Sequence, residues 1–343
     1  MNIFKQNRVL ILLVIVIAIG AILIGPKFSA KKEVKPSNLT KVSVALEWFP
    51  YANHVGLFIA KDKGYFAQEG LDVDLHTPAD PSTVLQTVAS GRDDFGISTQ
   101  IDVSIARTKS IPVVSIMAFA QHPISSVLTL VESGITQPRD LAGKKVGTPG
   151  YQYFETLLDT MLKHDGVSSG IKEVQLVDVG YDVVSALISK KVDAILAYWT
   201  TEFISATNQG FPVNIMRVEQ HGVPDYYELV LVTNEKTISE KKDLVQKFVR
   251  AVKRGYKDAI ADPQAGVKLM KKLKPEVDLA IESKGVDLFA SFLWVPENKI
   301  FGWQEKSKWI NIANWMKDNG LVSKTLDPKS AFDNSFVENA SKK

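Results

Sequence analysis

The segment from Val42 to Leu75 reads as strand, helix and strand, and this order restricts the chain to a mixed α/β fold. The first strand-like run, VSVALEWFP, ends in aromatic residues and proline, and the second, LDVDLHTP, follows a helix-like stretch. Ligands of open α/β sheets bind at the carboxyl ends of the strands. Trp48, Phe49 and His54 therefore lie where a ligand site is expected.

A weak internal repeat indicates two lobes. The runs SGRDDFGIST (Ser90–Thr99) and SKKVDAILAY (Ser189–Tyr198) share the order helix end, turn, Asp and strand, at an offset of 99 residues. A chain of 343 residues is also long enough for two domains. We therefore expect two similar α/β lobes with mostly parallel sheets, whose strand ends meet at a common cleft.

The carboxyl-terminal part of the chain is predicted to be helical. An amphipathic stretch covers Glu240–Ala261, Pro263 interrupts it, and helical patterns continue to about Lys317. This half is expected to pack back on the first lobe, so that the chain crosses between the lobes twice and the crossings form a hinge. The expected division is a leader at 1–35, lobe 1 at 36–124 and 226–343, and lobe 2 at 125–225.

The first 35 residues have the composition of an export signal. A basic start is followed by 17 apolar or glycine residues from Val9 to Gly25, a length between that of a signal-peptide core and a spanning helix. Phe28 stands where a signal peptidase prefers a small residue, which favours an uncleaved anchor over a cleaved signal peptide. We expect an extracytoplasmic, membrane-associated protein.

Composition excludes several classes of site. The chain has no cysteine, so disulfides, thiolate metal sites and thiol nucleophiles are absent. The leader holds six basic and one acidic residue, which leaves 35 basic and 37 acidic residues in the body. This balance gives no electrostatic basis for nucleic-acid binding. The five histidines lack metal-site spacing, and no phosphate-binding, dinucleotide-binding or nucleophile-elbow motif occurs.

Aromatic residues near three strand ends are candidate ligand contacts. Successive strand residues face opposite sides, so Trp48 and Phe49 cannot share one core; Trp48 is the candidate contact and Phe49 is expected to pack. Gly147–Glu155 places small residues before a helix, where free backbone amides can hold a polar group and Tyr151 or Tyr153 can stack. Asn53 and His54, after Trp48, are further candidates.

A carboxylate at the next strand end is a further candidate for ligand recognition. Ala197–Phe203 combines Tyr198 and Trp199 with Glu202, whose carboxylate could accept two hydrogen bonds from the polar edge of a ligand. The alternative is a solvated glutamate that stabilises a helix start. Tyr227, near the hinge, could contact ligand or hold its strand, and Gln100 and Asp102 could face the cleft or cap a helix, the role favoured for Asp102.

Several separated motifs resemble one family over about residues 40–330. They are ALEWFPYANH with KGYFAQEGLDV, GTPGYQYFE, DAILAYWTTE and GVPDYYELVLVTN. The chain resembles bacterial solute-binding proteins that deliver thiamine pyrimidine precursors to ABC importers, which are related to yeast-type pyrimidine precursor synthases. The resemblance implies a type II periplasmic-binding-protein fold with two α/β lobes, a hinge and a ligand cleft, in which Trp48 forms one wall of the pyrimidine pocket and Glu202 recognises the ring.

The implied function is binding and transport. The expected partners are a formylaminopyrimidine or hydroxymethylpyrimidine ligand, an ABC permease with its ATPase, and the membrane through the apolar leader, and the protein is expected to be a monomer without cofactor, metal or enzymatic activity. One alternative keeps the fold and changes the ligand to riboflavin, a sulfonate or nitrate. The other is a single-turnover synthase, which is disfavoured because Asp102 stands where those enzymes have their reactant histidine and Val223–Val232 lacks their cysteines.

Overall fold

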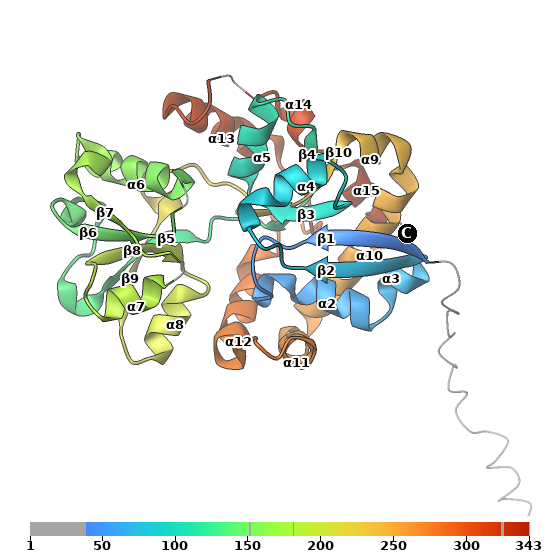
Figure 1. Cartoon of the computed structure of the whole chain (residues 1–343), viewed down its shortest axis with the longest axis horizontal. Coiled ribbons are helices and arrows are strands. Elements are labelled where there is room, and N and C mark those ends of the chain that lie inside the picture. Colours follow the sequence, from blue (N-terminus) through green and yellow to red (C-terminus); the bar gives the residue numbers. More distant parts are fainter. Residues whose placement is uncertain (1–38, 151, 181, 324–325, 343) are drawn as a thin grey trace, which may run out of the picture. The chain divides into compact units, whose positions relative to one another are not determined.

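Two five-stranded sheets form the framework of the molecule (Figure 1). The computed structural model describes residues 39–342 except 151, 181 and 324–325. The first sheet has the order β2 (Leu71–His76), β1 (Thr40–Ala45), β3 (Phe95–Ser98), β10 (Leu229–Asn234), β4 (Val113–Ala120). The second has the order β7 (Gln175–Asp178), β6 (Lys145–Thr148), β8 (Ala194–Tyr198), β5 (Ser125–Leu130), β9 (Val213–Arg217).

The two sheets are built alike, as the internal repeat predicted. β1 pairs in parallel with β2 and β3, and β6 pairs in parallel with β7 and β8. The repeated segments end in β3 and β8, which occupy the same third position in their sheets. Each sheet is mostly parallel, as predicted, and its fourth strand is the exception, because β10 is antiparallel to β3 and β4, and β5 is antiparallel to β8 and β9.

Two chain segments connect the sheets. The first joins the end of β4 at Ala120 to the start of β5 at Ser125, and the second leads from β9 through a short turn, Val218–Gln220, to β10 at Leu229. The strand that follows the first crossing is β5, and the strand that follows the second is β10. Each is the antiparallel strand of its sheet. The expected lobe boundaries remain a prediction.

Helices cover both sheets (Figure 1). Helix α10 packs along α2 so closely that a Cβ atom on Gly255 would lie 2.1 Å from the carbonyl oxygen of Gly56, which requires glycine at that crossing. The helices are α2 (Val55–Asp62), α3 (Tyr65–Gln68), α4 (Val84–Ala89), α5 (Gln100–Thr108), α6 (Gln152–His164), α7 (Val183–Ile188), α8 (Glu202–Asn208), α9 (Glu235–Glu240), α10 (Lys242–Ala261), α11 (Pro263–Leu273), α12 (Leu279–Leu288), α13 (Lys306–Asp318), α14 (Pro328–Ala331) and α15 (Ser335–Ser341).

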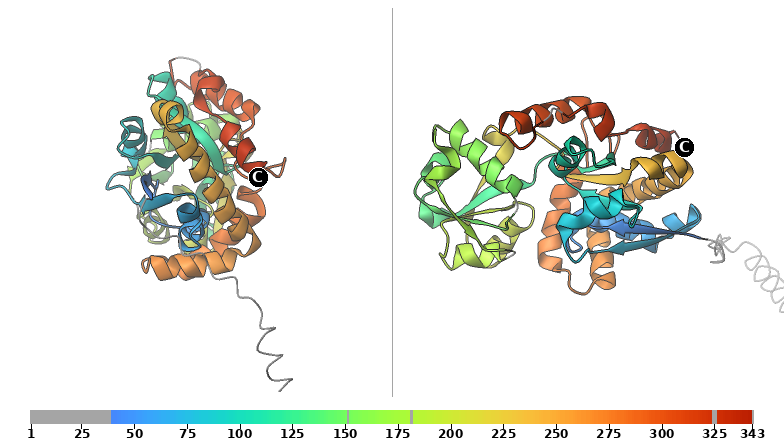
Figure 2. Two further views of the ribbon diagram at one scale, coloured as in Figure 1. Left: turned by 90° about the vertical axis from the view of Figure 1, so that its right-hand side faces the viewer. Right: turned by 45° about the horizontal axis from the view of Figure 1, so that its top comes forward.

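The carboxyl-terminal helices join the two lobes, as Figure 2 shows. In α13, Trp309 belongs to a buried cluster of the first lobe, whereas Ile312 and Met316 belong to a cluster with Phe154 and Leu157 of the second. The hydroxyl of Thr160 on α6 also donates a hydrogen bond to Asn319, 3.4 Å away, just beyond α13. This segment is therefore part of both cores.

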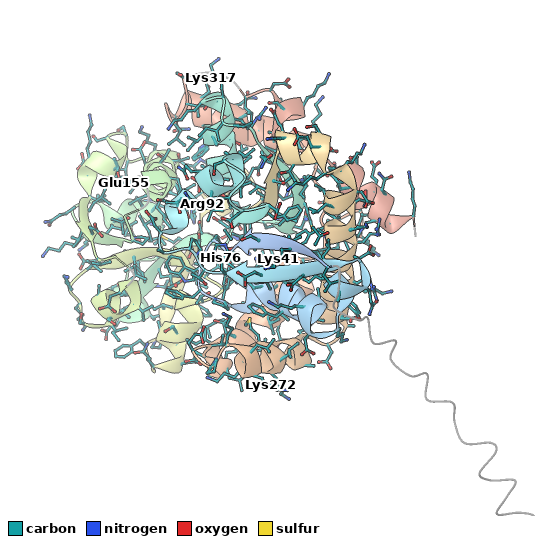
Figure 3. The ribbon with its side chains drawn as sticks, turned by 45° about the vertical axis from the view of Figure 1, so that its right-hand side comes forward. Lys41, His76, Arg92, Glu155, Lys272 and Lys317 are labelled. Carbon is teal, nitrogen blue, oxygen red and sulfur yellow. The ribbon has the colours of Figure 1, made fainter. Side chains whose placement is uncertain are left out.

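Two surface properties bear on localisation and partners. None of the helices in the described ranges combines the length and apolar character needed to span a bilayer. The predicted leader, including Val9–Gly25, lies outside the described residues. Exposed basic side chains are spread over the surface, as the positions of Lys41, Arg92, Lys272 and Lys317 show (Figure 3).

Candidate functional site

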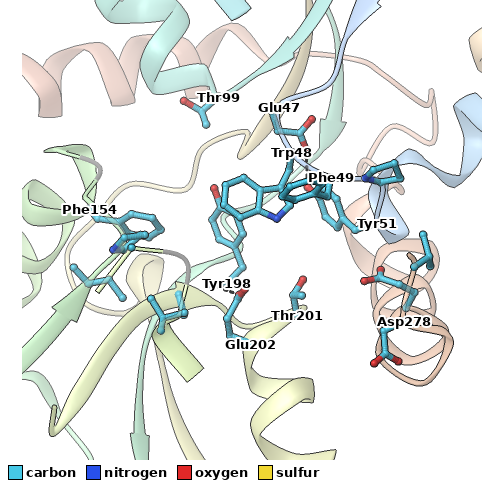
Figure 4. Close-up of a pocket in the computed structure, with 18 of the residues that line it drawn as sticks. Glu47, Trp48, Phe49, Tyr51, Thr99, Phe154, Tyr198, Thr201, Glu202 and Asp278 are labelled. Atoms are coloured by element: carbon cyan, nitrogen blue, oxygen red, sulfur yellow. Dashed lines mark hydrogen bonds between the residues drawn. The ribbon is translucent and has the colours of Figure 1, made fainter. Parts of the chain in front are cut away.

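A cavity of about 470 Å³ lies between residues of both lobes (Figure 4). The first lobe contributes the loop after β1, at 47–51, Thr99 after β3, and residues 276–282 at the start of α12. The second contributes Pro149 after β6 and residues at the end of β8. The carboxyl ends of β1, β3, β6 and β8 therefore meet at one cavity, in the position where α/β sheets bind ligands.

Aromatic side chains form much of the lining. Tyr153 and Tyr198 line the cavity from the second lobe, and their hydroxyl oxygens are 3.0 Å apart. The ring of Phe154 stacks on that of Tyr153, with centroids 4.6 Å apart. Trp48 lines the cavity from the first lobe (Figure 4). Flat apolar walls on two sides suit a planar aromatic ligand.

Phe49 differs from its predicted role. It was expected to pack in the core, but its side chain is 61% exposed and lines the cavity next to Trp48. The two rings meet edge to face, with centroids 6.1 Å apart. The expectation was wrong because the strand β1 ends at Ala45, so the alternation of faces does not extend to Trp48 and Phe49.

Glu202 lines the cavity at the first residue of α8. Its Oε2 atom accepts a hydrogen bond from the backbone N–H of Tyr198 at 2.9 Å, which fixes the carboxylate beside the strand end. Burial raises the pKa of Glu202 to about 7, against the hydrogen bonds that favour its charged form. The residue thus stands at a helix start and faces the cavity, so both of the roles weighed from sequence are open to it.

A hydrogen-bonded group behind the aromatic wall positions a second carboxylate, Glu47. The Nδ1 atom of His54 accepts from the backbone N–H of Tyr51 at 3.3 Å, so its Nε2 atom carries the proton and donates to Glu47 at 2.9 Å. The hydroxyl of Tyr51 donates to the other oxygen of Glu47 at 2.8 Å. His54 is fully buried, and its hydrogen bond fixes the position of the Glu47 carboxylate. Glu47 lines the cavity and was not among the residues predicted from the sequence.

Asn53 and Trp199, both predicted contacts, are buried beside the cavity. The Oδ1 atom of Asn53 accepts from the indole N–H of Trp294 at 3.4 Å, and its backbone oxygen accepts from the hydroxyl of Tyr256. The indole N–H of Trp199 donates to the carbonyl of Pro123 at 3.3 Å. Neither lines the cavity as the described residues define it, and their role as ligand contacts stays a prediction.

Gln100 and Tyr227 bind each other near the hinge. The backbone N–H of Tyr227 donates to the side-chain oxygen of Gln100 at 2.7 Å, and the Tyr227 hydroxyl accepts from the backbone N–H of Glu305 at 2.5 Å. Both are fully buried, so their observed contacts are structural and a ligand contact remains a prediction. Tyr151, the other predicted stacking residue, lies outside the described residues.

Asp102 was expected to cap a helix, and the cap is instead its neighbour Thr99. The Thr99 hydroxyl accepts from the backbone N–H of Asp102 at 2.9 Å and donates to its carboxylate at 3.0 Å. Asp102 thus stands at the third helical position of α5 and completes the cap. Burial raises the pKa of Asp102, opposed by its hydrogen bond from Thr99.

Three carboxylates at the start of α12 were not predicted from sequence. Glu276, Asp278 and Glu282 line the cavity on the side of the first lobe. Glu282 accepts a hydrogen bond from the backbone N–H of Ala52 at 2.6 Å, a contact between residues 230 positions apart. The local signal was limited to Asp278, whose side chain caps α12 through the N–H groups of Ala280 and Ile281.

Known proteins are similar to this chain in sequence and in fold. Residues 51–266 match the family described as NMT1/THI5 like. A formylaminopyrimidine-binding protein of Halalkalibacterium halodurans is 31% identical, covering 86% of this chain and 90% of that protein. A 4-amino-5-hydroxymethyl-2-methylpyrimidine phosphate synthase of Aspergillus parasiticus is 28% identical, covering 84% and 85%.

Solved structures support the fold. The periplasmic aliphatic sulphonate binding protein of Escherichia coli is 14% identical, covers 84% of this chain and 91% of that chain, and superimposes with a TM-score of 0.64. The periplasmic nitrate-binding protein of Synechocystis PCC 6803 is 12% identical, covers 89% of each chain, and has a TM-score of 0.64. The chain belongs to the NMT1/THI5-like family and has the type II periplasmic-binding-protein fold, with two α/β lobes and a ligand cleft between them.

Proposed function

We propose that this protein is the solute-binding component of an ABC importer and that it binds a thiamine pyrimidine precursor of the formylaminopyrimidine or hydroxymethylpyrimidine type. The observation that carries the proposal is a cavity with aromatic walls from both lobes and the carboxylate of Glu202 at its edge. The ring would stack against Trp48 and the tyrosines Tyr153 and Tyr198. Glu202 would accept hydrogen bonds from the amino edge of the ring.

The charge of the cavity supports this ligand over an anion. Among the described lining residues there is no lysine, arginine or histidine, whereas five carry carboxylates. A sulfonate, nitrate or phosphate group would lie in this acidic surrounding without a counter-ion. The lining therefore favours an unphosphorylated pyrimidine and disfavours the phosphate product named for the synthase relatives.

The position of Asp102 supports binding without reaction. Its carboxylate is held by Thr99 at the start of α5 and does not line the cavity as described. The apolar run Val9–Gly25 supports export across the membrane, with an uncleaved anchor keeping the protein near its permease. Ligand would favour closure of the lobes through the contacts that it makes with both of them.

Calorimetric titration of the full chain in mild detergent tests the proposal. The ligands are formylaminopyrimidine, hydroxymethylpyrimidine, riboflavin and a short alkanesulfonate. We expect micromolar or tighter binding of a pyrimidine, weakened at least about tenfold (about 1.4 kcal/mol) by Glu202→Gln. This variant keeps an oxygen that can accept from the N–H of Tyr198. Glu240→Gln, at an exposed position away from the cavity, is the matched control. Binding of riboflavin or the sulfonate alone would overturn the ligand assignment.

A further inference from the structure

The cavity has an acidic side that recognition of a neutral pyrimidine ring does not require. Glu276, Asp278 and Glu282 line it from the first lobe. Glu202 lies on the second lobe, across the cavity from Asp278 (Figure 4). Glu202 alone can serve the amino edge of one ring. The cavity volume of about 470 Å³ also leaves room beyond a single six-membered ring for a substituent.

Glu282 is the most constrained carboxylate of this group. Its side chain is only 7% exposed, yet it lines the cavity. Its Oε2 atom accepts a hydrogen bond from the backbone N–H of Ala52 at 2.6 Å. A nearly buried carboxylate is costly to ionise unless a positive charge lies beside it, because buried charges are normally paired. A positive charge on the ligand would supply that pair.

Among the described residues that line the cavity, none is a lysine, arginine or histidine that could neutralise these carboxylates. The basic residue of α12 is Lys284, and its ammonium group donates to the side-chain oxygen of Asn208 on α8. None of the ion pairs seen between described residues includes Glu202, Glu276, Asp278 or Glu282. Burial, together with the nearby charges of Glu202 and Asp278, raises the pKa of Glu282 to about 7, against its hydrogen bond from Ala52. A bound cation would reverse this effect and favour the charged carboxylate.

We propose that the cavity selects an aminopyrimidine whose substituent is positively charged, with Glu282 as the counter-ion of that substituent. The inference rests on the proposed function for the aminopyrimidine ring, and it differs in the substituent, because the formylamino and hydroxymethyl groups named there are neutral. A protonated aminomethyl group and a thiazolium ring are two examples of a charged substituent. The aromatic wall adds to the preference, because Trp48 and Tyr198 line the cavity and the faces of aromatic rings attract cations.

The test compares ligands that share the ring and differ in charge. Wild-type full chain in mild detergent is titrated with the aminomethyl, hydroxymethyl and formylaminomethyl pyrimidines and with thiamine, at neutral pH and low salt. We expect the aminomethyl compound or thiamine to bind at least about tenfold more tightly than the two neutral compounds. The preference should shrink as salt is added, since a charge contact is screened.

Three variants separate this inference from the proposed function. Glu282→Gln, which can still accept from Ala52, should reduce the preference for the cation to less than about threefold, whereas Glu202→Gln should weaken charged and neutral pyrimidines alike. Asp278→Asn, which keeps the helix cap, serves as a second variant and should reduce the preference in part. Glu240→Gln should leave every affinity unchanged.

The possible outcomes test the charge assignment and the proposed function separately. Equal or tighter binding of the neutral compounds by the wild type would overturn the charge assignment and leave the proposed function standing. A preference that survives both Glu282→Gln and Asp278→Asn would overturn the role of this acidic side. Binding of no pyrimidine at all would overturn the inference together with the proposed function.

Discussion

The carboxylate of Glu228 accepts hydrogen bonds from both the backbone N–H and the hydroxyl of Ser125, at 3.1 and 3.0 Å. It also accepts from the N–H of Ile124 at 2.9 Å and from the hydroxyl of Tyr226 at 3.0 Å. Ser125 begins β5 and Glu228 immediately precedes β10, so one fully buried side chain joins the two segments that cross between the sheets. The hinge is therefore a hydrogen-bonded pair of crossings.

Replacing Glu228 is predicted to destabilise the protein. Glu228→Ala leaves the N–H groups of Ile124 and Ser125 buried without their acceptor, and each such loss costs about 1–3 kcal/mol. Glu228→Gln keeps one acceptor and should cost less. The free energy of unfolding in urea measures both, with Glu240→Ala as the control at an exposed position. An unchanged free energy of unfolding in Glu228→Ala would contradict the structural role.

The same residue predicts a pH dependence of stability. Burial raises the pKa of Glu228 from 4.5 to about 7, opposed by the hydrogen bonds that it accepts. Between these two values the folded state binds more protons than the unfolded state, so the free energy of unfolding falls as the pH rises from about 4.5 to 7 and is flat above. Glu202 and Glu282 add slopes of the same sign.

Unfolding experiments across this pH range measure the effect. Glu228→Gln, which does not titrate, should flatten the slope, and Glu240→Gln should leave it unchanged. A slope that is the same in the wild type and in Glu228→Gln would contradict the raised pKa of Glu228 in the folded protein.

Local patterns were sufficient to predict the framework. The alternation of strand and helix and the internal repeat led to the equivalent positions of β3 and β8, because these signals come from neighbouring residues. The cavity required contacts between distant residues. Ala52 and Glu282 are 230 positions apart, and nothing near Glu282 in the chain indicates that its carboxylate meets the loop after β1.

Most of the remaining differences between the predicted and the observed site residues concern whether a side chain is buried. Gln100 was predicted at a strand end and Tyr227 near the hinge, as candidate ligand contacts, but both are fully buried, and the backbone N–H of Tyr227 donates to the side-chain oxygen of Gln100. Phe49 shows the opposite case, an aromatic residue that is exposed at the cavity. Sequence patterns give the face of a residue only within a regular element, and these residues lie at or beyond element ends.

Removing the indole of Trp48 is predicted to weaken pyrimidine binding. Loss of an aromatic stacking partner for a base costs about 1–3 kcal/mol, which corresponds to about five- to 150-fold in affinity. Trp48→Ala should therefore reduce the calorimetric affinity within that range and leave the unfolding midpoint nearly unchanged, since the side chain is only partly buried. Phe211→Ala removes another exposed aromatic side chain, away from the cavity, and should have no effect on affinity. Equal affinities for the two variants would show that Trp48 does not stack on the ligand.

Gly285 is placed where α12 of the first lobe meets the second. A Cβ atom at this position would lie 3.1 Å from the carbonyl oxygen of Thr200 and 3.4 Å from the Cβ atom of Ala52. The neighbouring Lys284 bonds Asn208 of α8, so α12 and α8 are in contact around this glycine. A larger side chain would have to separate the lobes, because the backbone of Thr200 cannot rotate away as a side chain can.

Gly285→Val should therefore hold the lobes apart and weaken ligand binding at least about tenfold. The radius of gyration of the ligand-saturated protein, measured by small-angle X-ray scattering, should exceed that of the wild type. Ala280→Val places the same valine side chain at an exposed position on the same helix and should change neither quantity. The added side chain could also clash with Ala52, which belongs to the first lobe. A clash with Ala52 would lower the unfolding midpoint of the unliganded protein, whereas a clash with Thr200 of the second lobe would not. Wild-type affinity and wild-type dimensions in Gly285→Val would mean that the contact between α12 and α8 does not limit closure.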